Sequence, residues 1–195
     1  MTATLLALCL LAYLSGAIPW SVWLGRAFYG VDVRAVADGN PGATNAYRAG
    51  GWKLGAAVVL LDFFKAFVPV LIARWGVRLP GEQVFLVALL PTVGHAFSIF
   101  LRFRGGRALA SMFGAWSGLT LYEVPLVMGG AAIVSTFALK NDAQRALAVP
   151  AAALAYVLVR GRPAWMVALA VAQIAVLAVK LVVHARAPRR PLPET

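Results

Sequence analysis

The chain has 195 residues, of which 62% are hydrophobic and 13% charged, and its mean hydropathy is +0.81. This composition is too apolar for a soluble domain of this length and is typical of an integral membrane protein. A net charge of +11 would suggest nucleic acid in a soluble protein, but here we attribute it to arginines that face lipid headgroups, the cytoplasm and an anionic substrate, and we expect no nucleic-acid partner.

Seven apolar segments predict an all-α membrane protein. Their residues do not alternate between apolar and polar, which excludes a β-barrel, and helices satisfy the backbone within lipid. No basic residue precedes the first segment, so we expect a retained helix rather than a secretory signal. We expect one membrane domain over residues 1–195, with a frayed tail at 187–195. The segments are Ala3–Leu24, Leu54–Ala73, Val84–Leu101, Ala108–Leu121, Val124–Leu139, Ala143–Val159 and Ala164–Val183.

The fourth and fifth segments are predicted to be two short passes. Joined as one helix they would be roughly 48 Å long, whereas the bilayer core is about 30 Å thick. Glu123 and Pro125 mark a turn between them. An odd number of passes, with the N-terminus outside and the C-terminus cytoplasmic, also satisfies the positive-inside rule. The inner loops and tail then hold twelve basic residues and the outer loops four, which are Arg74, Arg78, Arg160 and Arg162.

The stretch Gly39–Arg48, with the sequence Gly-Asn-Pro-Gly-Ala-Thr-Asn-Ala-Tyr-Arg, is rich in glycine and amides within an otherwise apolar chain. Glycines let the backbone approach a phosphate, and Asn, Thr and Arg side chains donate hydrogen bonds to it. A flexible turn between helices is the alternative interpretation. A second, similar loop further along the chain favours phosphate binding.

That second loop is Arg104-Gly105-Gly106-Arg107, which follows His95. The two glycines are expected to cradle an anion with their backbone N–H groups, while the arginines clamp it. The alternative is a basic loop that faces headgroups. His95 lies in an apolar segment, where a polar group is costly and often functional, although a structural hydrogen bond is the alternative.

Asp62 and Lys65 share one helix face because they are three residues apart, so they are expected to pair, or Lys65 to contact an anion. A single cysteine and two distant histidines give little support to a metal site, and we expect neither metal nor cofactor. The chain has no nucleophile elbow, no Walker-type loop and no histidine–aspartate box, because Phe100 stands where that box would have Asp. Catalysis by positioning and charge is therefore expected.

These motifs resemble the bacterial glycerol-3-phosphate acyltransferase PlsY family. The likeness covers most of the first 115 residues, and a seven-helix form with these loops on the inside agrees with that family. The motifs are Gly16-Ala17-Ile18-Pro19-Trp20, Gly39-Asn40-Pro41-Gly42-Ala43-Thr44-Asn45 with Arg48, Leu61-Asp62 with Lys65, and Gly94-His95 through Gly105-Gly106.

The resemblance implies acyl transfer from acyl-phosphate to the 1-hydroxyl of glycerol 3-phosphate, at the cytoplasmic face of a bacterial inner membrane. It gives lysophosphatidic acid and inorganic phosphate and needs no metal or coenzyme A. Membrane lipids would surround the protein and admit the acyl chain from the side. We expect the catalytic residues to be Asp38, His95 and Arg107. The implied phosphate-binding residues are Gly39, Asn40, Gly42, Thr44, Asn45, Arg48, Lys65, Arg104, Gly105, Gly106 and His184.

The chain departs from the family pattern at three places. Asp38 replaces a serine, and Asp38 could then act as a base on the acceptor hydroxyl. Arg104 and Arg107 replace lysines, which keeps the charge and changes the geometry. The C-terminal motif keeps His184 but lacks the asparagine. Two alternatives therefore stay open: a non-catalytic relative that binds a phosphorylated lipid or metabolite, and a small transporter of an organic phosphate.

Overall fold

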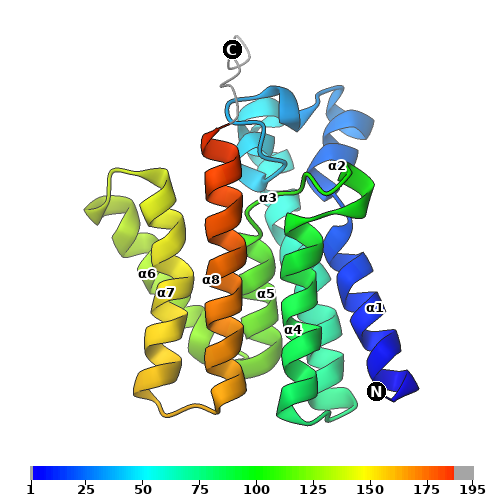
Figure 1. Cartoon of the computed structure of the whole chain (residues 1–195). Helices are drawn as coiled ribbons and strands as arrows, with labels where there is room; N and C mark the ends of the chain where they lie inside the picture. The colour runs from blue at the N-terminus through cyan, green and yellow to red at the C-terminus, as the bar shows by residue number, and fades with distance from the viewer. Residues whose placement is uncertain (1, 187–195) are drawn as a thin grey trace.

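The computed structural model describes residues 2–186, which form an all-helical bundle (Figure 1). The predicted frayed tail, residues 187–195, lies outside the described residues. The α-helices are α1 (Ala3–Ala17), α2 (Trp20–Tyr29), α3 (Ala43–Leu71), α4 (Gly81–Ala96), α5 (Leu109–Thr120), α6 (Glu123–Ala138), α7 (Asp142–Val159) and α8 (Ala164–Ala185). Three short helical turns lie between them, namely η1 (Val33–Ala35), η2 (Ile72–Gly76) and η3 (Ile99–Leu101).

The seven predicted segments correspond to helices in the structure. Most of their ends agree to within a few residues, but α3 begins well before the predicted Leu54. The first segment is divided into α1 and α2, with a bend of 44° at Ile18–Pro19. Proline disfavours helical geometry in the residue before it, which explains the break. The fourth and fifth segments are separate helices, as predicted, and a turn at Leu121 and Tyr122 divides them.

Helix α3 begins earlier than the sequence predicts. It starts at Ala43, so most of the polar stretch that ends at Arg48 forms its first turns instead of a loop. Its direction changes at Gly51, whose φ of 80° lies in the left-handed region that glycine adopts without strain. The first turns of α3 are therefore set apart from the long apolar part that continues to Leu71.

Among residues 2–186, four helices are long and apolar enough to cross a membrane, and a fifth span results if α1 and α2 count together. Helices α5 and α6 have 12 and 16 residues, which is short for a bilayer core. Seven complete crossings and the orientation of the termini therefore stay predictions.

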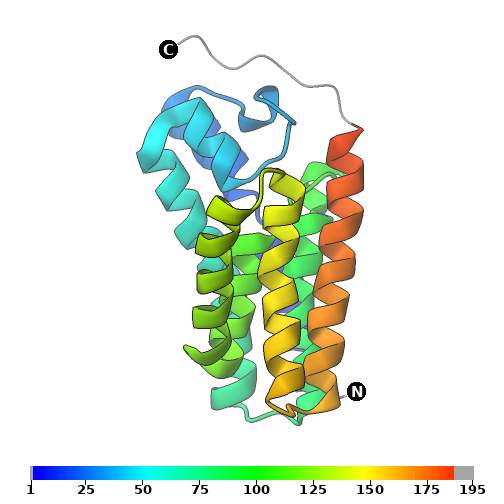
Figure 2. The same ribbon diagram turned by 90° about the vertical axis from the view of Figure 1, so that its left-hand side faces the viewer.

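The chain runs back and forth, so that the start of α1 and the end of α8 lie at opposite ends of the bundle (Figures 1 and 2). The α1–α3 and α4–α5 connections lie at the same end as the end of α8. Both predicted phosphate-binding stretches are thus at one end, as the sequence analysis requires. Helix α3 packs on α5, α1 on α4, and α8 on α4 and α7.

A buried polar network joins three of these helices inside the bundle. Trp116 on α5 donates to Gln173 Oε1 on α8 over 2.9 Å, and Gln173 Nε2 donates to Thr92 Oγ1 on α4 over 3.3 Å. All three side chains are fully buried. In an apolar interior each of these groups needs its partner, so the network fixes how α4, α5 and α8 face one another.

Replacing Gln173 by Leu leaves the Trp116 N–H without an acceptor, and we expect the variant to lose about 1–2 kcal/mol of stability. Thermal unfolding of the purified protein in detergent measures this as a lower midpoint. Val171→Leu is the matched control, because Val171 lies on the same helix and is half exposed. Equal midpoints for Gln173→Leu and the wild type would show that the network contributes nothing.

Candidate active site

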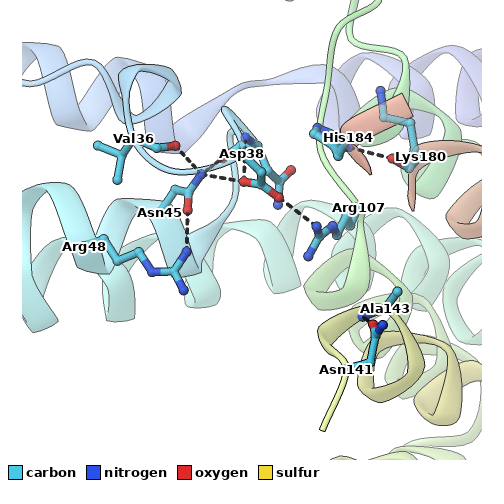
Figure 3. A network of polar contacts seen from close by, with 10 residues as sticks. Val36, Asp38, Asn45, Arg48, Arg107, Asn141, Ala143, Lys180 and His184 are labelled. Carbon is cyan, nitrogen blue, oxygen red and sulfur yellow. Dashed lines mark hydrogen bonds and ion pairs between the residues drawn. The ribbon is translucent and has the colours of Figure 1, made fainter. Parts of the chain in front are cut away.

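The Asn45 side chain organises the first polar stretch. Its Nδ2 donates to Val36 O, Asp38 Oδ1 and Asn40 O, over 3.0, 2.9 and 3.1 Å (Figure 3). The amide therefore joins the first turn of α3 to the loop before it, and it is buried. Asn45, which is predicted to bind phosphate, thus holds the backbone of this loop in place.

The start of α3 presents groups that suit an anion. The N-cap is Gly42, which has no side chain to accept from the first N–H groups of the helix, and Thr44 is exposed in the first turn. Arg48, also exposed, donates from Nη1 to Asn45 Oδ1 over 3.3 Å. A helix N-terminus with an arginine beside it attracts negative charge. Ser21 on α2 holds the segment that leads into α3, because its hydroxyl donates to Pro41 O over 2.8 Å.

The second polar loop differs from the prediction in its backbone. The N–H groups of Gly105 and Gly106 donate to Ala96 O and His95 O, each over 3.1 Å. These N–H groups satisfy two carbonyl groups at the end of α4 and are not available to an anion. The predicted cradle of glycine N–H groups is therefore wrong. Arg104 is exposed at the edge of the loop.

Gly106 allows the two polar stretches to pack closely against one another. A Cβ atom on Gly106 would lie 2.5 Å from His95 Nε2 and 3.0 Å from Asn40 Oδ1, so only glycine lets the two polar stretches meet at this point. Three other residues of the loop, Arg102, Phe103 and Ala108, have φ between 51° and 63°, although none is glycine. Backbone strain of this kind gathers at functional sites.

One ion pair joins the two polar stretches. Arg107 Nη2 donates to Asp38 Oδ2 over 2.7 Å, and both side chains are about one quarter exposed. Burial raises the pKa of the Asp38 carboxyl, but hydrogen bonds from the Asn40 N–H and the Asn45 amide, with Arg107 and His184 nearby, hold this pKa below its ordinary value. Asp38 is therefore ionised at neutral pH. His184 lies beside this pair in Figure 3, and its Nδ1 is 2.7 Å from Lys180 O.

A second cluster of charges lies beneath the loops. Lys65 Nζ is 2.6 Å from Asp62 Oδ1, as the three-residue spacing predicts, and it also donates to Ile18 O over 3.0 Å. His95 Nδ1 is 3.7 Å from the same Asp62 oxygen. Lys65 and His95 line a small cavity, with about 10 Å³ of accessible space, that reaches Pro41 and Gly106 in the two polar stretches.

Sequence reasoning missed two groups that hold the site. Ser98 donates from its hydroxyl to Ala17 O over 2.5 Å, and thereby ties the second loop to the end of α1. Lys180 is buried with its Nζ 5.2 Å from the centre of the Phe97 ring. A lysine within an apolar segment is the only sequence signal for either of them. Between residues 2 and 186, no group of three or more His, Cys, Asp or Glu side chains is arranged to hold a metal.

A family model described as "Glycerol-3-phosphate acyltransferase" matches residues 6–192 of the chain. The chain belongs to this family. A relative from Thermus thermophilus, a glycerol-3-phosphate acyltransferase, is 41% identical over 86% of this chain and 82% of its own length. One from Anaeromyxobacter sp. strain Fw109-5 is 53% identical over 58% of this chain and 59% of its own length, so the match spans about three fifths of that relative.

The fold agrees with a solved member of the family. The crystal structure of PlsY, an integral membrane glycerol 3-phosphate acyltransferase, in its glycerol 3-phosphate form has a TM-score of 0.85 with this protein. The two chains are 27% identical, and the match covers 97% of this chain and 96% of PlsY. The family resemblance that the polar motifs indicated is thereby confirmed.

Gly106→Ala tests the contact between the two stretches. The added methyl group collides with His95 and Asn40, and we expect a loss of about 1–3 kcal/mol, measured as a lower thermal midpoint. Gly130→Ala on α6 is the matched control, because its Cβ would meet nothing within 4 Å and alanine favours a helix. If both variants have the wild-type midpoint, the close approach at Gly106 does not constrain the fold.

Proposed function

We propose that this protein transfers an acyl group from acyl-phosphate to the 1-hydroxyl of glycerol 3-phosphate. The hydroxyl oxygen forms a bond to the acyl carbon, the bond from that carbon to the phosphate oxygen breaks, and the hydroxyl proton leaves with the phosphate or through a neighbouring base. The products are lysophosphatidic acid and inorganic phosphate. The reaction takes place at the cytoplasmic face of a bacterial inner membrane, in contact with membrane lipids.

One observation carries this proposal: the start of α3 and the loop after α4 meet at one end of an apolar bundle, with Arg48 and Arg107 on the two sides. Both substrates carry phosphate, and both arginines can bind phosphate oxygens through two N–H groups. Their charges would neutralise the substrates and the departing phosphate, while the helix N-terminus orients them. Such a site accelerates a reaction by positioning and electrostatics.

His95 and the cavity beneath the loops complete the proposed site. The imidazole lies at the seam where Gly106 meets Asn40, with Asp62 on its Nδ1 side. A histidine with a carboxylate behind it is suited to exchange a proton with a bound group. Lys65 adds positive charge below the loops, and Thr44, Arg104 and His184 contribute donors at the rim.

A second candidate rests on the Asp38–Arg107 pair. The Asp38 carboxylate already occupies a guanidinium that could bind phosphate. This arrangement would suit a relative that binds a phosphorylated lipid or metabolite without converting it. A transporter is less well supported, because the polar groups gather at one end of the bundle rather than around a site at mid-depth (Figure 1).

Purified protein with acyl-phosphate and glycerol 3-phosphate is expected to release inorganic phosphate. Arg48→Ala removes one anchor of the substrate phosphate, and we expect release to fall by at least about 100-fold. Arg160→Ala is the matched control, because Arg160 is exposed at the end of α7, and the α7–α8 connection lies at the opposite end of the bundle (Figure 1).

The outcome separates the two candidates. Absence of phosphate release from the well-folded wild type would overturn the acyl-transfer proposal. Binding of glycerol 3-phosphate without release, and loss of that binding in Arg48→Ala, would favour the non-catalytic relative. Equal activity in Arg48→Ala and the wild type would remove Arg48 from the site.

A further inference from the structure

The Asp38 carboxylate is surrounded by hydrogen-bond donors from separate parts of the chain. Oδ1 accepts from the Asn40 N–H over 3.1 Å and from Asn45 Nδ2 over 2.9 Å, and Oδ2 accepts from Arg107 Nη2 over 2.7 Å (Figure 3). His184 lies near the same pair. A backbone N–H, a carboxamide and a guanidinium therefore converge on one anion, and this anion belongs to the protein.

These are the kinds of donor that a phosphate needs, and two of them come from residues assigned to phosphate binding. The Asn45 amide nitrogen is already engaged by three acceptors. Arg107 has one guanidinium nitrogen on Asp38, and its buried Nε has no hydrogen-bond partner among the described residues. A phosphate that binds the Nε–Nη2 edge of Arg107 must therefore take the place of the Asp38 oxygen.

Charge makes the replacement selective. A carboxylate and a phosphate within the same few ångströms repel one another, so a phosphate that binds Arg107 weakens the hold of this guanidinium on Asp38. A phosphate monoester with two negative charges and three terminal oxygens can outcompete one carboxylate for this donor. An anion with a single charge gains too little to do so.

We propose that Asp38 is a specificity-determining residue of the acceptor site. In the substrate-free protein its carboxylate accepts hydrogen bonds from the groups that would donate to a phosphate, and it keeps these groups in place. When a doubly charged phosphate monoester binds, Arg107 leaves Asp38 and donates to the phosphate instead. The carboxylate thus weakens binding of every phosphate and excludes singly charged anions. This inference rests on the proposed function, since it concerns the site in which glycerol 3-phosphate would bind.

Two substitutions at this position test the exchange. Asp38→Ser removes the carboxylate, and Asp38→Asn keeps its size and its acceptor oxygen for Asn45 but removes the charge that holds Arg107. The KM for glycerol 3-phosphate is expected to fall about tenfold in both variants, with a parallel fall in the inhibition constant of inorganic phosphate. The kcat is expected to stay within about threefold of the wild type, because only binding changes.

Asp32→Asn is the matched control. Asp32 lies in the same connection and pairs with Arg26 and Arg34 over 2.9 and 2.8 Å, and neither arginine is among the residues that we assign to phosphate binding. Its KM is expected to equal that of the wild type. A fall in all three variants would show that the effect comes from net charge alone and would overturn the proposal.

Two results at Asp38 would also overturn it. A large loss of kcat in both variants would make Asp38 the base that acts on the acceptor hydroxyl, and a higher KM would make it a direct contact of the glycerol. An unchanged KM would show that Arg107 is never exchanged. The thermal midpoint of each variant, measured in the same detergent, establishes that it is folded.

Failure of the proposed function is distinguishable from failure of this inference. If no variant turns over, isothermal titration with inorganic phosphate still compares the proteins. Tighter binding in Asp38→Ser and Asp38→Asn than in the wild type and Asp32→Asn supports the exchange. Equal binding in all four proteins overturns it.

Discussion

Backbone carbonyls at two helix breaks impose the constraint on which the site depends. A helix that ends within an apolar bundle leaves carbonyl groups that require donors. At the α1–α2 break, Ala17 O accepts from Ser98 and Ile18 O accepts from Lys65. At the end of α4, His95 O and Ala96 O accept from the two glycines of the second loop. The need to satisfy these carbonyls brings distant segments together at one end of the bundle.

The buried ion pair of Asp62 and Lys65 belongs to the same arrangement. Such a pair contributes little net stability, because removing two charges from water costs about as much as their attraction returns. Its value lies in geometry, since Lys65 links Asp62 on its own helix to Ile18 O at the α1–α2 break. Asp62 in turn lies against His95 on α4. Three helices are thereby fixed in register directly beneath the two polar stretches.

Much of this architecture is readable in the sequence, because apolar runs and basic loops follow from the bilayer itself. Most ends of the predicted segments agree with the helices to within a few residues, although α3 begins earlier, and the three-residue spacing of Asp62 and Lys65 predicts their pairing. The predicted anion partner of the Gly105 and Gly106 N–H groups is wrong, because these groups donate to two carbonyls at the end of α4. The sequence alone does not show that α4 ends beside this loop. Ser98 could not be recognised either, because its acceptor, Ala17 O, is 81 residues away in the chain. Local pattern identifies polar groups, whereas tertiary packing decides their partners.

The phosphate site that we propose needs a group that holds its donors while no substrate is bound, and Asp38 is suited to that task. Donors gathered for a phosphate would repel one another and lack acceptors whenever the substrate is absent, and buried donors without acceptors are costly. A carboxylate that accepts from Asn40, Asn45 and Arg107 keeps those donors satisfied and ordered. In the exchange that we propose, the same carboxylate competes with the substrate, so preorganisation of the site and affinity for phosphate are in opposition. An aspartate at this position, where the family resemblance implies a serine, would therefore favour an ordered empty site over a tightly bound substrate, within helices that keep the family fold.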